Sequence, residues 1–390
     1  MTHRERFRAW LDRRAADRVP FLDWWGIPHY REEEWRRQGL AAGADIYQWI
    51  GFDGADGAGT TELERPEVGD GYLYVPFRGH ETVFLDTYAR PAFAREVVEA
   101  GAGYRLEVEP SFGGVTRIVE PSADNPLGAV HGERYPVSAL TDWALYRDRF
   151  QGADLGRYLY RCGEPQIERC ARTRFPVELK VPGPLGRLWA TIGLYNSGGV
   201  LESLYDRPAF LAEMIDFWVA FACELARPAL TRLKVDFATI EDGLAYDGGA
   251  FLSPDLLRRF IAPAYRRLTD FFHAGGVPVV FLNSGGSLNA FLPDLLDAGI
   301  GGITHVAVQA GMDLVHLKRE YGADLHLIGG IDRRALTESD AAIEREVDRA
   351  TAALEMSGVI PCLDASVLYG TPLARYRHYA DCLARRLGVG

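Results

Sequence analysis

The chain has 390 residues, and 43 Lys and Arg against 54 Asp and Glu give it a formal net charge of −11 and a pI near 5.4. With 47% hydrophobic and 25% charged residues, the composition is that of a globular protein and excludes a largely disordered chain. The acidic balance excludes a general binder of nucleic acids or anionic membranes, because both need a basic face.

The cysteines and the apolar runs indicate the compartment. No cysteine pair has CxxC spacing, and an odd number of cysteines does not form a disulfide framework. The first 20 residues are charged and lack the apolar segment of a signal peptide, and no uncharged apolar run approaches the roughly 18 residues of a membrane span. We therefore expect a cytoplasmic protein with no membrane contact. The five cysteines are Cys162, Cys170, Cys223, Cys362 and Cys382.

A short apolar run, a polar or Gly-rich loop and an amphipathic helix recur along the chain, which is typical of a parallel α/β sheet or barrel. Eight such strands are expected, the number that a (β/α)8 TIM barrel requires. In chain order they are Arg18–Trp24, Ile46–Phe52, Pro176–Val181, Val235–Ile240, Val277–Leu282, Gly302–Val308, Leu325–Ile328 and Val359–Leu363. Ser253 and Pro254 predict the N-cap and first residue of a helix, which Pro263 should kink or split.

One stretch interrupts this rhythm. Residues 56–149 alternate short β-rich runs with Gly, Pro and Asp, a pattern that favours an antiparallel meander. We expect a single barrel domain over residues 1–390, with 56–149 as a β-rich insertion after the second strand that folds over one mouth as a lid.

The active site of a TIM barrel lies at the C-terminal ends of its strands, so the residues that follow each strand are the candidates. Glu241 and Asp242 form the sharpest local feature, because two adjacent carboxylates in different environments can have separated pKa values and divide the roles of acid and base. Either residue could instead cap a loop by accepting backbone N–H groups. Asp23 and Tyr246 complete the predicted catalytic set.

The remaining candidates are expected to bind substrate. Lys180 is unusual inside an apolar strand, and it either pairs with the carboxylates at 241 and 242, binds a substrate carboxylate, or forms a structural ion pair. The two tryptophans of the first loop could stack on a planar or apolar ligand or belong to the core. The predicted substrate-binding residues are Trp24, Trp25, His29, Lys180, Asn283, Ser284, His305, Asp332, Asp364 and Tyr369.

Several segments resemble the uroporphyrinogen decarboxylase superfamily in the same order along the chain. They include RERFRAWLDRRAADRVPFLDWWG, VELKVPGPLGRL, DFATIEDGLAYDGGAFLSPDLL, VVFLNSGGSLNAFLPDLL, GADLHLIGGIDRRAL and GVIPCLDASV. The resemblance implies a (β/α)8 barrel. It also implies one of two chemistries, namely cofactor-free decarboxylation of porphyrins, or zinc-dependent methyl transfer to or from corrinoid proteins or thiols.

The chain departs from both branches of this superfamily. The zinc-type methyltransferases carry His-x-Cys-Gly where Asn283 and Gly285 stand, and their further cysteine falls near Ala365. Asn, Gly and Ala supply none of the donors that zinc prefers, so we expect no metal and no cofactor. The porphyrinogen decarboxylases have an arginine-rich first loop, whereas this one is acidic and aromatic, and Asp23 would repel an acidic porphyrinogen.

Three functions follow, and the first is favoured. It is a metal-independent lyase that decarboxylates, or performs related acid–base chemistry on, a small or medium organic substrate other than uroporphyrinogen, with a homodimer as the expected assembly. The second is a methyltransferase or demethylase that works with a corrinoid protein, with zinc ligands drawn from Glu241, His305 and Cys362. The third is a barrel that binds a ligand without turning it over, as the small residues Gly285, Ala307 and Ala365 would allow.

Overall fold

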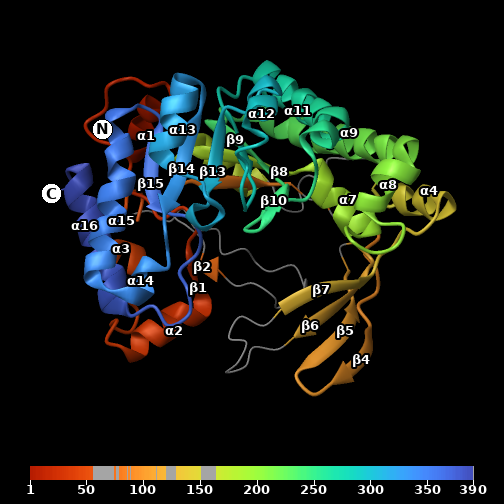
Figure 1. The fold of residues 1–390 in the computed structure, drawn as a ribbon, viewed down its shortest axis with the longest axis horizontal. Coiled ribbons are helices and arrows are strands. Elements are labelled where there is room, and N and C mark those ends of the chain that lie inside the picture. The colour runs from red at the N-terminus through yellow and green to blue at the C-terminus, as the bar shows by residue number, and fades with distance from the viewer. Residues whose placement is uncertain are drawn as a thin grey trace.

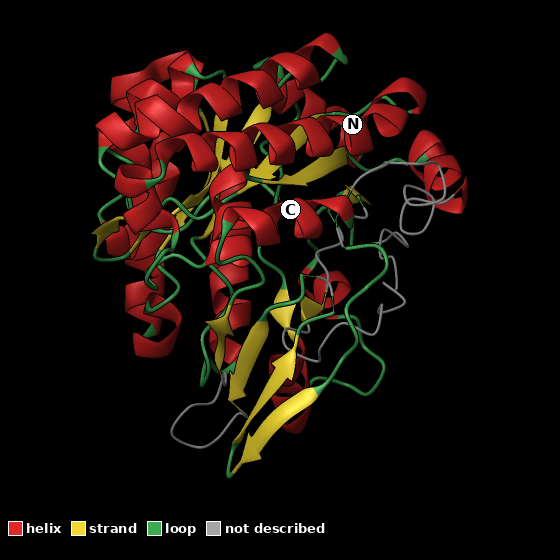
Figure 2. Ribbon diagram, turned by 90° about the vertical axis from the view of Figure 1, so that its right-hand side faces the viewer, coloured by secondary structure: helices red, strands yellow, loops and turns green. Residues whose placement is uncertain are grey.

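The computed structural model describes residues 1–55, 74–75, 79–85, 87, 89–110, 112–119, 129–150 and 164–389. Cys162 and most of the run at 72–79 lie outside these residues. The main body is a curled parallel sheet whose outer face is covered by helices (Figure 1; Figure 2). Within the described residues no helix is both long and apolar enough to cross a membrane.

Seven strands form this sheet, and every neighbouring pair is parallel. They are β3 (Glu81–Phe84), β8 (Val177–Pro182), β9 (Phe237–Glu241), β12 (Val280–Asn283), β13 (Gly302–Val306), β14 (His326–Ile331) and β15 (Val359–Leu363). The spatial order β15-β14-β13-β12-β9-β8-β3 follows the chain, as it does in a (β/α)8 barrel. The sheet is thus barrel-like, although hydrogen-bonded pairing between β3 and β15 does not close it.

Helices connect these strands, as the βα rhythm predicts. The main ones are α7 (Pro184–Ile192), α8 (Val200–Asp206), α9 (Pro208–Arg232), α11 (Ala262–Ala274), α12 (Leu292–Asp297), α13 (Leu314–Tyr321), α15 (Asp340–Thr351) and α16 (Leu373–Leu387). Ser253 caps a helical stretch by accepting from the backbone N–H of Leu256, as predicted. That stretch is split near Pro263 as well, because a π-turn at Leu257–Ile261 precedes α11.

Two of the eight expected strands were wrong. Ile46–Ile50 is a helix (α3), because the Asp45 side chain accepts from the backbone N–H groups of Tyr47 and Gln48 and so caps it. Residues 18–24 carry no strand. Pro20 there has no N–H to give to a ladder, and the N–H of Phe21 goes to the Asp53 carboxylate at 2.8 Å instead.

Two residues of this segment, Leu22 and Trp24, nevertheless occupy the barrel interior. Leu22 and Trp24 pack with inward-facing residues of four strands, and α1 (His3–Leu11) covers the same core from the N-terminal ends of those strands. The side chains of this apolar core are almost fully buried. The segment therefore fills the interior position of a first barrel strand through side-chain packing, without backbone pairing to the sheet. The core comprises Phe7, Trp10, Leu11, Leu22, Trp24, Phe237, Phe281, Ile328, Ile360 and Cys362.

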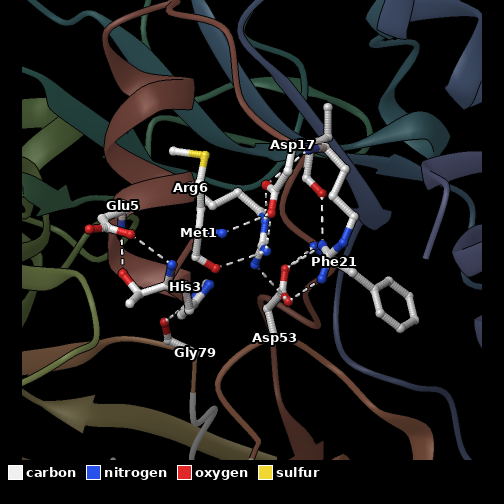
Figure 3. Close-up of polar contacts among 11 residues, drawn as sticks. Met1, His3, Glu5, Arg6, Asp17, Phe21, Asp53 and Gly79 are labelled. Atoms are coloured by element: carbon white, nitrogen blue, oxygen red, sulfur yellow. Dashed lines mark hydrogen bonds and ion pairs between the residues drawn. The ribbon is translucent and has the colours of Figure 1, made fainter. Parts of the chain in front are cut away.

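A polar network fixes this N-terminal segment (Figure 3). The buried Asp53 carboxylate accepts from Arg6 at 3.1 Å and from two nitrogens of Arg18 at 2.6 and 2.7 Å. Arg6 also donates to both oxygens of Asp17, at 2.7 and 2.8 Å. Because these bonds join α1, the segment after it and the turn that follows α3, they hold the first loop against the sheet.

The expected insertion exists but is shorter than predicted. An antiparallel four-stranded sheet runs from β4 (Val97–Gly101) through β5 (Tyr104–Val108) and β6 (Val115–Val119) to β7 (Ala129–Arg134). It projects from the side of the body where β10 lies (Figure 1). The run that begins at Glu81, which we assigned to the insertion, is instead β3 of the main sheet.

The remaining elements are short or peripheral. Two-stranded pairs are formed by β1 (Ile27–Pro28) with β2 (Tyr74–Val75) and by β10 (Ala245–Tyr246) with β11 (Gly249–Ala250). The other helices are α2 (His29–Arg37), α4 (Leu140–Asp148), α6 (Glu164–Arg172), α10 (Pro254–Leu256) and α14 (Ala335–Glu338).

Candidate active site

Glu241 stands at the centre of a polar group at the C-terminal ends of β8, β9 and β12. In the parallel register it lies beside Pro182 on one neighbour and Asn283 on the other. Its Oε1 accepts from Lys180 Nζ at 3.1 Å and from Asn283 Nδ2 at 3.0 Å. The side chain is 45% exposed, so the carboxylate is both positioned by the strands and open to solvent.

A buried carboxylate, Glu178, lies on β8 two residues before Lys180 and contributes charge to this group. Glu178 faces the same side of β8 as Lys180 and is almost fully buried, with His80 Nε2 at 3.0 Å and Thr82 Oγ1 at 2.8 Å from its Oε2. Burial alone would lower the pKa of Lys180, but Glu178 and Glu241 outweigh it and raise that pKa. Lys180 is therefore a fixed ammonium between two carboxylates, and a substrate carboxylate would have to compete with both.

Asp242 does not share the position of its neighbour. Its carboxylate accepts from the backbone N–H groups of Leu185 (3.1 Å) and Gly186 (2.6 Å) in the first turn of α7, and from the Tyr265 hydroxyl at 2.8 Å. Burial raises the pKa of Asp242 in spite of these donors. A Cβ on Gly183 would come within 2.2 Å of Asp242 Oδ2, so the backbone closes tightly around this carboxylate. Asp242 thus fixes α7 to the end of β9, the capping role that the sequence left open.

His305 and Trp25 meet across the mouth from a different direction. Their ring centroids lie 4.5 Å apart, and Gly285 faces the imidazole, with an ideal Cβ at 3.5 Å from His305 Cε1. A register shift between Ile303 and Val306 interrupts the pairing of β13 with β14, and such bulges redirect side chains. Burial lowers the pKa of His305 to about 4, helped by Arg333, so the imidazole is neutral at physiological pH.

Arg333 was missed by the sequence analysis. It follows β14, its guanidinium donates to the Ser366 carbonyl at 2.9 Å, and its Nε is buried without a hydrogen-bond partner. Asp364 lies beside it and accepts from the backbone N–H groups of Arg333 and Val308, each at 3.2 Å. Burial raises the pKa of Asp364 to about 6. The sequence signal for Arg333 was its place two residues after the end of β14. Asp332, its neighbour at the same strand end, was predicted instead.

The other predicted residues have separate positions. Asp23 is buried and accepts from the Tyr376 hydroxyl on α16, and burial raises its pKa. Trp24 stacks on His80 at 5.0 Å within the apolar core. Ser284 Oγ accepts from the Leu244 N–H at 2.9 Å, and Asp332 is paired with Arg334 at 2.6 Å.

The last two candidates are Tyr369, which lies at the surface, and His29, whose side chain is outside the described residues. Tyr369 is exposed and lies under the Arg31 guanidinium, 5.0 Å from its ring centroid. His29 begins α2, but its side chain lies outside the described residues.

An aromatic rim borders the Glu241 group, and of its members the sequence analysis named Tyr246 alone. Trp189 of α7 approaches Gly243, the second residue after Glu241, and Tyr246 stacks on Phe251 at 5.4 Å. Because the rim comes from α7, the loop after it and the β10–β11 hairpin, no single sequence window contains it. Its members are Trp189, Tyr195, Tyr246 and Phe251.

Comparison with known proteins agrees with this geometry. Residues 194–386, which carry β9 to β15 and most of the strand-end residues, match the family model described as uroporphyrinogen decarboxylase (URO-D). Over these residues the chain resembles the uroporphyrinogen decarboxylase family. No curated protein matches the sequence.

Among solved structures, a methyltransferase shares the fold of this chain, and two methionine synthases are more distantly similar. A methyltransferase from Methanosarcina mazei superposes with a TM-score of 0.57 at 15% identity, covering 100% of this chain and 98% of that one. A B12-independent methionine synthase from Shewanella sp. W3-18-1 gives 0.37 at 15% identity over 76% and 74%. A putative vitamin-B12 independent methionine synthase from Listeria monocytogenes gives 0.35 at 14% over 57% and 69%.

The zinc site of the superfamily's methyltransferases does not fit the residues at this mouth. Asn283 is engaged with Glu241, Gly285 faces His305, and Ala365 carries no donor. Cys362 is buried in the apolar core, where burial raises the pKa of its thiol. Among the described residues, Glu241, His305 and Cys362 do not converge as a group that could hold a metal ion, so the alternative ligand set for zinc is wrong.

Proposed function

We propose that this chain is an enzyme that decarboxylates a planar or apolar organic acid in the mouth of the barrel without a metal ion, with Glu241 as the proton carrier. The match of residues 194–386 to the uroporphyrinogen decarboxylase family supports an enzyme, and the donor chemistry at Asn283, Gly285 and Ala365 favours acid–base chemistry over zinc-dependent methyl transfer. The observation that carries the proposal is the state of Glu241, whose half-exposed side chain is held by a partly exposed lysine and an asparagine.

The hydrogen bonds of Glu241 leave one oxygen for the reaction. Lys180 and Asn283 both donate to Oε1, and among the described residues no donor reaches Oε2. An oxygen that accepts two hydrogen bonds is a poor place for a proton, so the Glu241 carboxylate would take up a proton from water at Oε2. A carboxyl group in this arrangement can hand that proton to a substrate carbon and take another from water.

The other side of the mouth offers the substrate its anchor. Arg333 is charged, has a buried N–H without a partner, and can bind a carboxylate through two parallel hydrogen bonds. Trp25 and the aromatic rim provide flat apolar surface for the rest of the molecule. In the reaction the bond between the carboxyl group and its carbon breaks, CO2 leaves, and the electron pair left on carbon takes the proton from Glu241.

A deuterium experiment tests the assignment. Aromatic and heteroaromatic carboxylic acids are incubated with the protein in D2O, and proton NMR follows the loss of the acid and the deuterium placed on the carbon that lost CO2. We expect Glu241→Gln to lower the rate by about 10²-fold or more, the usual size of a general acid–base contribution. Glu213→Gln is the matched control, because that carboxylate is 47% exposed and also lies 3.1 Å from a cation, Arg147.

Two outcomes contradict the proposal. One is turnover that needs stoichiometric zinc and is lost on chelation. The other is a protein that releases no CO2 from any acid yet methylates cob(I)alamin or a thiol from a methylated donor, which would show the methyltransferase chemistry of the superfamily.

A further inference from the structure

Three potential metal ligands converge on the outer surface, on helices that the proposed reaction does not use. His378 and Cys382 are one turn apart on α16, and Glu344 projects from α15, which packs against α16. His378 Nε2 lies 3.2 Å from Glu344 Oε1 and 3.5 Å from Cys382 Sγ. All three ligand atoms lie within 4.8 Å of one another.

These separations match the edges of a zinc coordination tetrahedron. With Zn–N near 2.0 Å, Zn–S near 2.3 Å and tetrahedral angles, an imidazole nitrogen and a thiolate sulfur are about 3.5 Å apart. The same construction with a carboxylate oxygen at about 2.1 Å puts oxygen and nitrogen about 3.3 Å apart. The two distances in the structure therefore need almost no adjustment to accept the ion.

The surroundings suit a thiolate ligand at a solvent-accessible position. Cys382 is 5% exposed, whereas the Glu344 side chain is 57% exposed, so an ion would enter from the carboxylate side. Arg385 donates to Cys382 Sγ at 3.1 Å. A donor of this kind can remain in place as an outer contact to a metal-bound sulfur and stabilise its negative charge.

We propose that Glu344, His378 and Cys382 bind one Zn²⁺ ion, with water in the fourth position, and that the ion ties α15 to α16. A borderline-soft ion fits one sulfur, one nitrogen and one oxygen donor better than magnesium or calcium, which prefer oxygen. Binding replaces the thiol proton of Cys382, which leaves to solvent, by the metal–sulfur bond. The ion is structural, because it spans two consecutive outer helices.

Metal titration of the full-length, metal-free protein tests the site. We expect one equivalent of Zn²⁺ in competition with a chromophoric chelator, and a rise in Tm on zinc addition because the ion binds the folded state. Cobalt should give a thiolate-to-metal absorption band in the near ultraviolet that Cys382→Ser abolishes. Loss of a residue that merely orients a ligand costs about 10–100-fold in affinity, so Cys382→Ser should weaken zinc binding by at least about 100-fold.

Two further variants keep the test independent of folding. Glu344→Gln changes an exposed side chain, leaves the helix intact, and should weaken zinc binding by about tenfold or more. His316→Ala is the matched control, because His316 forms an exposed pair with Glu320 at 3.2 Å and has no cysteine beside it. Zinc binding that survives Cys382→Ser and Glu344→Gln, or no stoichiometric uptake by the wild-type protein, would overturn the proposal.

Discussion

The adjacent carboxylates Glu241 and Asp242 have different hydrogen-bond partners and different structural roles at the end of β9. Glu241 is bonded by side chains and open to solvent, whereas Asp242 is bonded mainly by backbone N–H groups and closes the contact with α7. The chain reversal after the strand turns one side chain into the mouth and the other against a helix end. A carboxylate pair in a sequence therefore does not by itself indicate a catalytic pair.

This division predicts opposite effects of two conservative substitutions. Asp242→Asn places an amide N–H₂ against donors and should lower the free energy of unfolding by about 2–4 kcal/mol, because buried donors lose their acceptor. Glu241→Gln should change it by less than about 1 kcal/mol, since the side chain is half-exposed. Urea denaturation measures both. Equal losses in the two variants would contradict the assignment of Asp242 as the structural residue.

His305 predicts a pH dependence of stability. Its pKa is about 4 in the folded protein against 6.5 for the free side chain, so between these values the unfolded chain binds more protons. The His305 contribution is therefore complete above about pH 6.5 and is lost as the pH falls toward 4. Relative to His305→Gln, the wild type should lose about 3 kcal/mol across this range, measured by denaturation at several pH values. A constant difference between the two proteins would show that His305 is not buried as neutral imidazole.

At the scale of elements, ion pairs and hydrogen bonds to Asp53 hold the first segment of the barrel in place, and no strand hydrogen bonds do so. Asp53 accepts from Arg6, Arg18 and the N–H of Phe21, and these bonds replace the strand pairing that residues 18–24 lack. Burial would raise the pKa of Asp53, but the bonds from Arg18 and Phe21 outweigh it, and the net pKa is lowered. The carboxylate is consequently ionised at neutral pH and balances two guanidinium groups.

Removal of this charge should be costly. Asp53→Asn leaves the largely buried Arg18 without its counter-charge, whereas Arg6 keeps Asp17, and should destabilise the protein by about 3–5 kcal/mol. Asp17→Asn is the comparison, because Asp17 also binds Arg6 but is 40% exposed, and about 1 kcal/mol or less is expected. Thermal or urea unfolding distinguishes them. Comparable small losses in both variants would mean that the first loop is held by packing alone.

At the scale of the whole molecule, α1 covers the end of the barrel opposite the candidate site. Phe7 of α1 contacts the ring of Phe237 with centroids 5.3 Å apart, and Phe7, Trp10 and Leu11 belong to the interior core. The mouth that carries the candidate site and the apolar core under α1 thus share one barrel interior, with Glu178 and Lys180 forming its polar side. The apolar core that stabilises the fold and the polar group around Glu241 therefore lie at different levels along the barrel axis.

Phe7→Ala tests this separation. Deletion of a buried aromatic ring should cost about 3–5 kcal/mol, while the activity per folded molecule stays unchanged because the ring contacts of Phe7 are with His3, Trp10 and Phe237, outside the Glu241 group. Leu145→Ala on α4 is the control, since Leu145 is 74% exposed and should change stability by less than about 0.5 kcal/mol. An activity loss in Phe7→Ala that exceeds the unfolded fraction would show coupling between the apolar core and the mouth.

The sequence by itself determined the parallel α/β class, six of the seven strands of the main sheet and the strand-end position of Glu241, Asn283 and His305. These features follow from local periodicity and from the rule that parallel strands end at a common edge. Only the tertiary structure decided that Ile46–Ile50 is a helix, that β3 joins the main sheet, that Asp242 binds α7, that Arg333 lies beside Asp364, and that the aromatic rim borders Glu241. The physical reason is that each depends on where a side chain or a backbone N–H finds its partner, and those partners come from segments distant in the sequence.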